Sequence, residues 1–190
     1  TIVEMKKNYG RAKIHTILKK SENRVIPKCS FFGTCGGCQL QHLNYQSQIS
    51  IKQQWVKDAL IRIGKLEAPE VNEVIPSKNH YAYRRHISLS IRNQRVGYIG
   101  IDGHSLVQVT KCPIFIEENS LLNELQAIVA QFKIEEKDAK LTVLKQEESY
   151  ILHFHFKILP VNAKEIIQKE FKNNTKFKGI ILSSKTNTIK

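Results

Sequence analysis

The apolar residues of this chain follow two periods, and each period predicts a different kind of element. Helical spacing marks three segments, which are 45–63, 117–132 and 161–171. Strand patterns, with alternation at period two in 86–91, mark the predicted strands, which are 86–91, 96–101, 106–109, 141–144, 150–157, 178–183 and 187–189. Runs of strands interrupted by helices predict an α+β fold, with an antiparallel sheet and flanking helices.

The first predicted helix has the clearest ends. Asn44 precedes it and is a favoured N-cap residue, and Gly64 follows its last apolar position, Ile63. Trp55 falls on the apolar side of this helix together with Val56 and Leu60, so we expect Trp55 to lie in the core.

The first 24 residues form a separate unit in our interpretation. Ile14, Thr16 and Leu18 alternate with their neighbours, and the stretch 7–10 has turn-forming residues, so we expect two short strands within residues 1–19. Two strands do not fold alone. Residues 1–24 are therefore predicted to be the end of a small β module that begins upstream, and 25–190 to be a second domain. The absence of an initiator Met also suggests a piece of a longer chain.

The net charge indicates which classes of partner the chain is suited to bind. Lys and Arg number 30 against 17 Asp and Glu, a net charge of +13 that favours nucleic acid first and a membrane surface second. No apolar run approaches the roughly 20 residues of a membrane span, and no signal peptide is present. Four cysteines are too few for a secreted disulfide scaffold of this size, so we expect a cytoplasmic protein, and we expect a monomer.

The cysteine pattern is the strongest chemical signal. Cys29, Cys35 and Cys38 lie within ten residues, and Cys112 follows far downstream, directly before Pro113. A zinc ribbon usually has two C-x2-C knuckles, whereas this chain has one. Three clustered cysteines with a distant Cys-Pro are more typical of a 4Fe-4S cluster. A zinc site, disulfides or unconnected cysteines are the alternatives.

The glycines beside the cysteines fit a cluster site. Gly36 and Gly37 allow the backbone to bend around a bound group, so that its N–H groups face the sulfurs. His42 follows this loop and is expected to cap the next helix or to pack beside the site. His153 and His155 share one strand face, and we interpret them as strand surface and not as metal ligands.

Aromatic and basic residues mix at 81–86. Arg84 and Arg85 are candidate RNA contacts, because arginine binds phosphate through two parallel hydrogen bonds and stacks on unpaired bases. Their alternation places them on opposite faces of a strand, so one of them at most is expected to reach RNA directly. The alternative is that the tyrosines are core residues and an arginine pairs with an acid.

The loop at 28–43 carries a resemblance to a known family. Its pattern C-x-x-F-G-x-C-G-G-C-x-x-Q-H resembles the signature of the iron–sulfur RNA uridine-5 methyltransferases, and similarity continues at 83–85, 96–98, 112–114 and 186–187. The two leading strands resemble the end of a TRAM domain, the RNA-binding β-barrel of the branch that modifies large-subunit ribosomal RNA. This resemblance implies a 4Fe-4S cluster on Cys29, Cys35, Cys38 and Cys112. Within the TRAM-like part, the RNA contacts would be Lys6, Lys7 and Arg11, unless these are solvated residues at a strand edge.

The resemblance also implies a reaction. In the family, a cysteine thiolate adds to carbon 6 of a flipped-out uridine, carbon 5 takes the methyl group of S-adenosylmethionine, and a carboxylate removes the carbon-5 proton. The cluster motif uses all four cysteines here, and no glycine-rich signature for the methyl donor is present. We therefore expect a cluster-bearing RNA-binding domain that is inactive alone, with a structural and not an electron-transfer cluster. A zinc-binding nucleic-acid module and a ferredoxin-like electron-transfer domain are the competing hypotheses.

Overall fold

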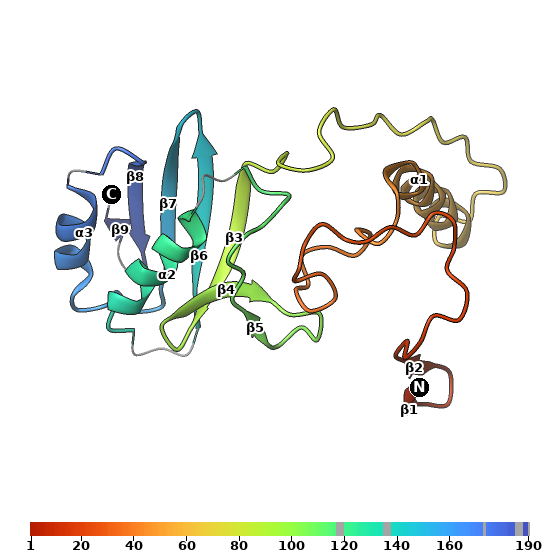
Figure 1. Cartoon of the computed structure of the whole chain (residues 1–190), viewed down its shortest axis with the longest axis horizontal. Helices are drawn as coiled ribbons and strands as arrows, with labels where there is room; N and C mark the ends of the chain where they lie inside the picture. Colours follow the sequence, from red (N-terminus) through yellow and green to blue (C-terminus); the bar gives the residue numbers. More distant parts are fainter. Residues whose placement is uncertain (117–119, 135–137, 173, 185–187, 190) are drawn as a thin grey trace.

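The computed structural model describes residues 1–116, 120–134, 138–172, 174–184 and 188–189. Within these ranges, a hairpin precedes a long helix and a seven-stranded sheet, which has the strand order β5-β4-β3-β6-β7-β8-β9 (Figure 1). The helices are α1 (Tyr45–Arg62), α2 (Leu121–Gln131) and α3 (Ala163–Phe171). The strands are β1 (Ile2–Met5), β2 (Gly10–Ala12), β3 (His86–Arg92), β4 (Arg95–Ile99), β5 (Leu106–Val107), β6 (Asp138–Gln146), β7 (Ser149–His155), β8 (Phe177–Ser183) and β9 (Thr188–Ile189). No described helix is both long enough and apolar enough to cross a membrane.

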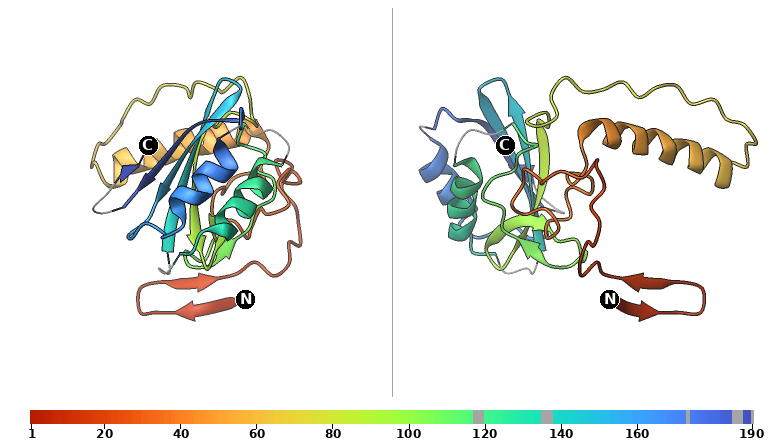
Figure 2. Two further views of the ribbon diagram at one scale, coloured as in Figure 1. Left: turned by 90° about the vertical axis from the view of Figure 1, so that its left-hand side faces the viewer. Right: turned by 45° about the vertical axis from the view of Figure 1, so that its right-hand side comes forward.

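The hydrophobic core lies between one face of the sheet and the two helices α2 and α3, which both cover that face (Figure 2). Alternate residues of β3, β6 and β7 point into it, as the period-two pattern predicts. Helix α2 contributes a fully buried stripe, which includes Leu121, Leu125 and Val129. The opposite face of the sheet carries mainly polar side chains.

The expectation of an antiparallel sheet is wrong for one pair of strands. β7 and β8 run parallel, whereas each of the other paired neighbours in the sheet is antiparallel. The cause is the crossover through α3, because a helix between two adjacent strands returns the chain to the same end of the sheet. The sheet is therefore mixed.

Most predicted boundaries are displaced by a few residues. β6 is longer than the predicted strand 141–144, since its whole length pairs with β3 and β7. β5 ends at Val107 and not at residue 109, because its partner strand β4 offers only two paired residues. The predicted start of the second helix at 117–119 and the family-like stretch 186–187 lie outside the described residues.

Helix α1 starts as predicted but does not pack as predicted. The Asn44 side chain accepts a hydrogen bond from the Ser47 amide at 2.8 Å, which makes Asn44 the N-cap. None of the residues of α1 is buried, and Trp55 is 54% exposed. The expectation that Trp55 is a core residue is therefore wrong, because α1 lies away from the sheet and its helices (Figure 2).

The segment at 71–80 accompanies α1. The Gln53 side chain donates to the backbone oxygens of Val71 and Asn72, and the Ser77 amide donates to the Tyr45 hydroxyl at 2.7 Å. The Tyr45 ring also stacks on His80, with 3.6 Å between their centroids. Polar and aromatic contacts therefore hold this segment, in place of an apolar core.

The N-terminal hairpin is shorter than the predicted pair of strands. Met5 pairs with Gly10, and the Lys6 amide donates to the Tyr9 oxygen, so the second strand starts immediately after the turn. The alternating segment that includes Ile14 and Leu18 is not a strand, and Leu18 is 95% exposed. The prediction of a strand there is wrong, because the residues of β1 already pair with β2 and leave no partner strand for the later segment.

Candidate metal centre

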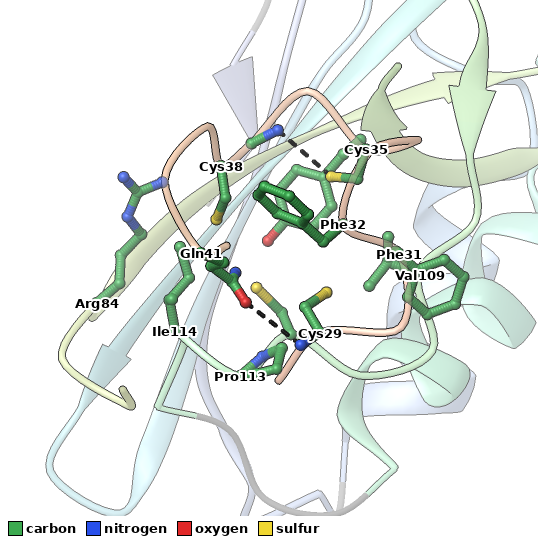
Figure 3. A pocket seen from close by; sticks show the side chains of 13 residues that line it. Cys29, Phe31, Phe32, Cys35, Cys38, Gln41, Arg84, Val109, Pro113 and Ile114 are labelled. Carbon is green, nitrogen blue, oxygen red and sulfur yellow. Dashed lines mark hydrogen bonds between the residues drawn. The ribbon is translucent and has the colours of Figure 1, made fainter. Parts of the chain in front are cut away.

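The four cysteines line one cavity of about 30 Å³. Three of them come from the loop before α1, and Cys112 comes from the segment after β5. Figure 3 shows Cys29, Cys35 and Cys38 with their sulfurs turned toward a common space. The folded chain thus brings together the side chains that the spacing singled out, across the 73 residues between Cys38 and Cys112.

The cysteine loop is attached to the end of β4. The Gly36 amide donates to the Ile99 oxygen at 3.0 Å, and the Ile101 amide donates to the Thr34 oxygen at 2.9 Å. A Cβ atom on Gly36 would lie 2.9 Å from the Ile99 oxygen. Glycine is therefore needed at residue 36 for this close approach to the sheet, which the sequence did not reveal.

The segment after Cys112 is attached to the start of β3. The Ala82 amide donates to the Pro113 oxygen at 2.8 Å, and the Arg84 amide donates to the Ile114 oxygen at 2.8 Å. Cys112 and Arg84 are therefore held by the same backbone ladder. Arg84 also lines the cavity, and its guanidinium group points away from the sulfurs (Figure 3).

Backbone and hydroxyl donors face two of the sulfurs. The Gly37 amide lies 3.4 Å from the Cys35 sulfur, as expected for a loop that wraps a bound group. Burial raises the pKa of the Cys112 thiol, and hydrogen bonds from the Tyr98 hydroxyl and the amides of Ile114 and Phe115 offset part of that rise. These donors stabilise sulfur in its anionic form.

In the protein without a bound metal, burial affects the pKa of the cysteine thiols more than these hydrogen bonds do. It is the largest cause that raises the pKa of the Cys35 and Cys112 thiols above their ordinary value, and the neighbouring cysteines raise both further. Both groups are therefore neutral thiols at pH 7, and a bound metal cation would favour their thiolate forms by compensating the negative charge.

Apolar side chains and one buried amide complete the cavity wall. Phe31, Phe32 and Ile114 line it, and the buried Gln41 side chain accepts a hydrogen bond from the Cys29 amide at 3.3 Å. His42 packs against Phe32, with 5.6 Å between the ring centroids, as one of its two predicted roles required. In the described part of the chain, no three Cys, His, Asp or Glu side chains are placed to hold a single metal ion.

The predicted RNA contacts fall in two places. Arg84 and Arg85 are exposed beside the cysteine cavity, at the start of β3. Lys6, Lys7 and Arg11 are exposed on the N-terminal hairpin, which projects away from the sheet (Figure 2). On that hairpin, Lys6 and Arg11 both pair with Glu4, at 3.1 and 3.5 Å.

Sequence reasoning missed one cation beside the cavity. The Lys28 ammonium group lies over the Tyr81 ring, 4.7 Å from its centroid, directly before the first cysteine. No spacing rule joins two residues 53 positions apart, so the sequence alone offered no signal for this pair.

Relatives of the chain carry a common description. It is 38% identical over 193 residues to a protein of Protochlamydia amoebophila, covering 96% of this chain and 44% of that protein. A protein of Clostridium tetani is 35% identical over 144 residues, which cover 73% of this chain and 31% of the relative. Both are named uncharacterized RNA methyltransferases, and the chain spans less than half the length of either. No family model matches the chain.

A solved structure shares the fold. The tRNA (uracil-54, C5)-methyltransferase of Pyrococcus abyssi, solved with S-adenosyl-L-homocysteine, superposes with a TM-score of 0.65 at 22% sequence identity. The match covers 98% of this chain and 44% of that enzyme. The chain therefore has homologues that are named RNA methyltransferases, and its fold is found within an RNA methyltransferase.

Proposed function

We propose that the chain is the iron–sulfur, RNA-binding part of an S-adenosylmethionine-dependent RNA uracil-5 methyltransferase that acts on large-subunit (23S) ribosomal RNA. The observation that carries this proposal is the convergence of Cys29, Cys35, Cys38 and Cys112 on one cavity, in a chain whose homologues are named RNA methyltransferases. Residues 1–24 are, in this proposal, the end of a TRAM-like barrel, and residues 25–190 form the cluster domain.

The residues around the cavity fit a 4Fe-4S cluster. Four thiols are available, amide and hydroxyl donors face two of them, and the remaining wall is mainly apolar. A zinc ribbon usually has two C-x2-C knuckles, whereas this chain has only the one formed by Cys35 and Cys38.

The role of the cluster in this proposal is structural. When bound, it supplies iron–sulfur bonds that join the loop at 29–38 to Cys112. Both segments are also attached to the sheet, the loop through Ile99 and the Cys112 segment through Arg84. Arg84 and Lys28 lie beside the joined segments. Both side chains are exposed, so each can contact a phosphate of the RNA backbone.

The methyl transfer itself is assigned to parts of the protein outside these 190 residues. All four cysteines line the cavity, so none serves as the nucleophile in this proposal. The contribution of the chain is to bind and orient RNA, for which the net charge of +13 is suited.

Metal and sulfide analysis of protein purified without oxygen tests the cluster. We expect about four irons and four acid-labile sulfides per chain, and a large loss of both in Cys38→Ser. The variant Ser30→Ala is a matched control within the same loop and should retain both. About one zinc and no sulfide would overturn the proposal in favour of a zinc-binding nucleic-acid module.

The choice of RNA is tested with the full-length protein. Ribosomal RNA transcripts should accept a methyl group on uracil from S-adenosylmethionine, while transfer RNA transcripts should not. Methylation of transfer RNA alone would keep the enzyme class and overturn the ribosomal substrate.

A further inference from the structure

The face of the sheet that α2 and α3 leave uncovered has an ordered polar surface. We call it the open face and define it by Ser88, Ser90, Lys140, Thr142, His153, His155 and Ser183. Strand register sets these residues in two adjacent rows. One row runs from Ser90 through Lys140 and His155 to Ser183, and the other runs from Ser88 through Thr142 and His153 to the apolar Ile181. Neither row contains a carboxylate, so a polyanion meets no repulsion from them.

Hydrogen bonds orient the two imidazole rings on this face. The Ser183 hydroxyl lies 2.8 Å from His153 Nε2 and 3.3 Å from His155 Nδ1, and the Thr142 hydroxyl lies 3.4 Å from His155 Nε2. The ring centroids of the two histidines are 3.5 Å apart. The rings therefore form one fixed aromatic platform on β7, with hydroxyl groups on the neighbouring strands.

The platform is neutral and its neighbour is charged. Burial lowers the pKa of His153 and of His155, and His153 and Lys140 lower that of His155 further. Both rings are thus uncharged at pH 7, where they offer aromatic surface in place of positive charge. Lys140 is exposed beside His155 and supplies the cation.

This combination matches the chemistry that recognises unpaired RNA. Bases that are not stacked in a helix stack on aromatic side chains, including histidine, while lysine and hydroxyl groups contact phosphates and the 2′-hydroxyl. We infer that the open face binds a single-stranded segment of RNA, with bases on His153 and His155 and the backbone along Lys140 and the hydroxyl groups. This inference rests on the proposed function, and it adds a second RNA surface to the one beside Arg84.

Binding of a labelled oligouridine of about 12 nucleotides to the chain with its metal retained tests the platform. We expect the double variant His153→Ala, His155→Ala to bind about tenfold more weakly, which corresponds to about one lost base stack. The variant His104→Ala is the matched control, because it removes an exposed imidazole from the turn before β5. Its affinity should equal that of the unaltered chain.

Lys140→Gln tests the same face without altering the aromatic network, since the Lys140 side chain is exposed. Its binding should be weaker, and the salt dependence should fall by about 0.7 log units of affinity per log unit of salt, as for one lost phosphate contact. Lys164→Gln removes the same charge from α3, which covers the other face of the sheet, and should leave the slope unchanged.

The outcomes separate the two proposals. If the unaltered chain binds RNA and the open-face variants bind equally well, the inference is wrong, while the proposed function stands. Equal losses in the open-face variants and in their controls would also overturn it. If the unaltered chain binds no RNA at all, both proposals fall. Should the double variant fail to fold, the affinity and salt dependence of Lys140→Gln still test whether the open face binds RNA.

Discussion

Residues 1–80 and residues 86–184 bury very different amounts of apolar surface. Every buried hydrophobic side chain in the described residues lies between Ile87 and Leu182, whereas the first 80 residues bury only the polar Gln41. Apolar residues are nevertheless common in the first region, where Ile26 is 94% exposed and Trp55 is 54% exposed. The second region is stabilised by its own core. The first is held by hydrogen bonds, ring contacts and, in our proposal, by a metal cluster.

A core substitution should give the largest difference between the regions. Leu125 is fully buried against the sheet, so Leu125→Ala should lower the free energy of unfolding by about 2–5 kcal/mol. The same change at Leu18, which is 95% exposed, should shift it by less than about 0.5 kcal/mol. Urea unfolding followed by circular dichroism measures both, and equal losses would contradict the comparison.

Loss of the proposed cluster should affect the first region most. Cys38→Ser, which is expected to lose the cluster, should have a free energy of unfolding about 2–4 kcal/mol below that of the metal-loaded unaltered chain, similar to the loss of one cross-link. Limited proteolysis should then cut within residues 25–44, while the sheet remains resistant. An unchanged melting temperature, or cleavage within the sheet instead, would count against a cluster that holds the loop.

The helix cap should have a smaller and local effect. Asn44→Ala removes the acceptor for the Ser47 amide and should cost about 1 kcal/mol of helix stability. Hydrogen exchange should become faster at the start of α1 and remain unchanged in β6. Lys52→Ala, an exposed change in the same helix, is the control, and faster exchange throughout the sheet in Asn44→Ala would show that the regions are coupled.

The smallest expected effect is a local loss of stability at low pH, in the turn that contains Asp102. The amides of His104 and Ser105 and the Ser105 hydroxyl hold the pKa of Asp102 at about 2, below its ordinary value of 3.8. A lowered pKa gives stability that is present above about pH 4 and is lost as the pH falls toward 2. The turn at 100–105 should therefore loosen in that window, as followed by the amide signal of Ser105 in NMR. A carboxyl that titrates near 3.8 would contradict these hydrogen bonds.

Local chemistry could be read from the sequence, and long-range contact could not. Asn44 was predictable as the N-cap because capping depends on the residue type and on amides three positions away. The apolar side of α1 was also predictable, but periodicity does not say whether anything packs against that side, so the position of Trp55 was wrong. The parallel pairing of β7 and β8 follows from the helix α3 between them and not from the pattern of either strand alone.

The candidate site shows the same division. The spacing of Cys29, Cys35 and Cys38 indicated a common site, and Cys112 joined it through its Cys-Pro context. The reason for glycine at residue 36 could not be found in the same way, because the crowding atom belongs to Ile99. Contacts such as Lys28 with Tyr81 depend on how the loop meets the start of β3, and no local pattern encodes this.

The separation of the cysteines along the chain determines when, during synthesis, the fourth cysteine becomes available. The ribosome adds about 5–20 residues per second, so the 74 residues from position 39 to Cys112 take roughly 4–15 s to synthesise. During that interval, the loop has three thiols and no fourth. The strand to which it attaches, β4, is also completed only after the loop has left the ribosome. The cavity therefore assembles late in the synthesis of the chain. The first three thiols are open to oxidation until Cys112 has been synthesised.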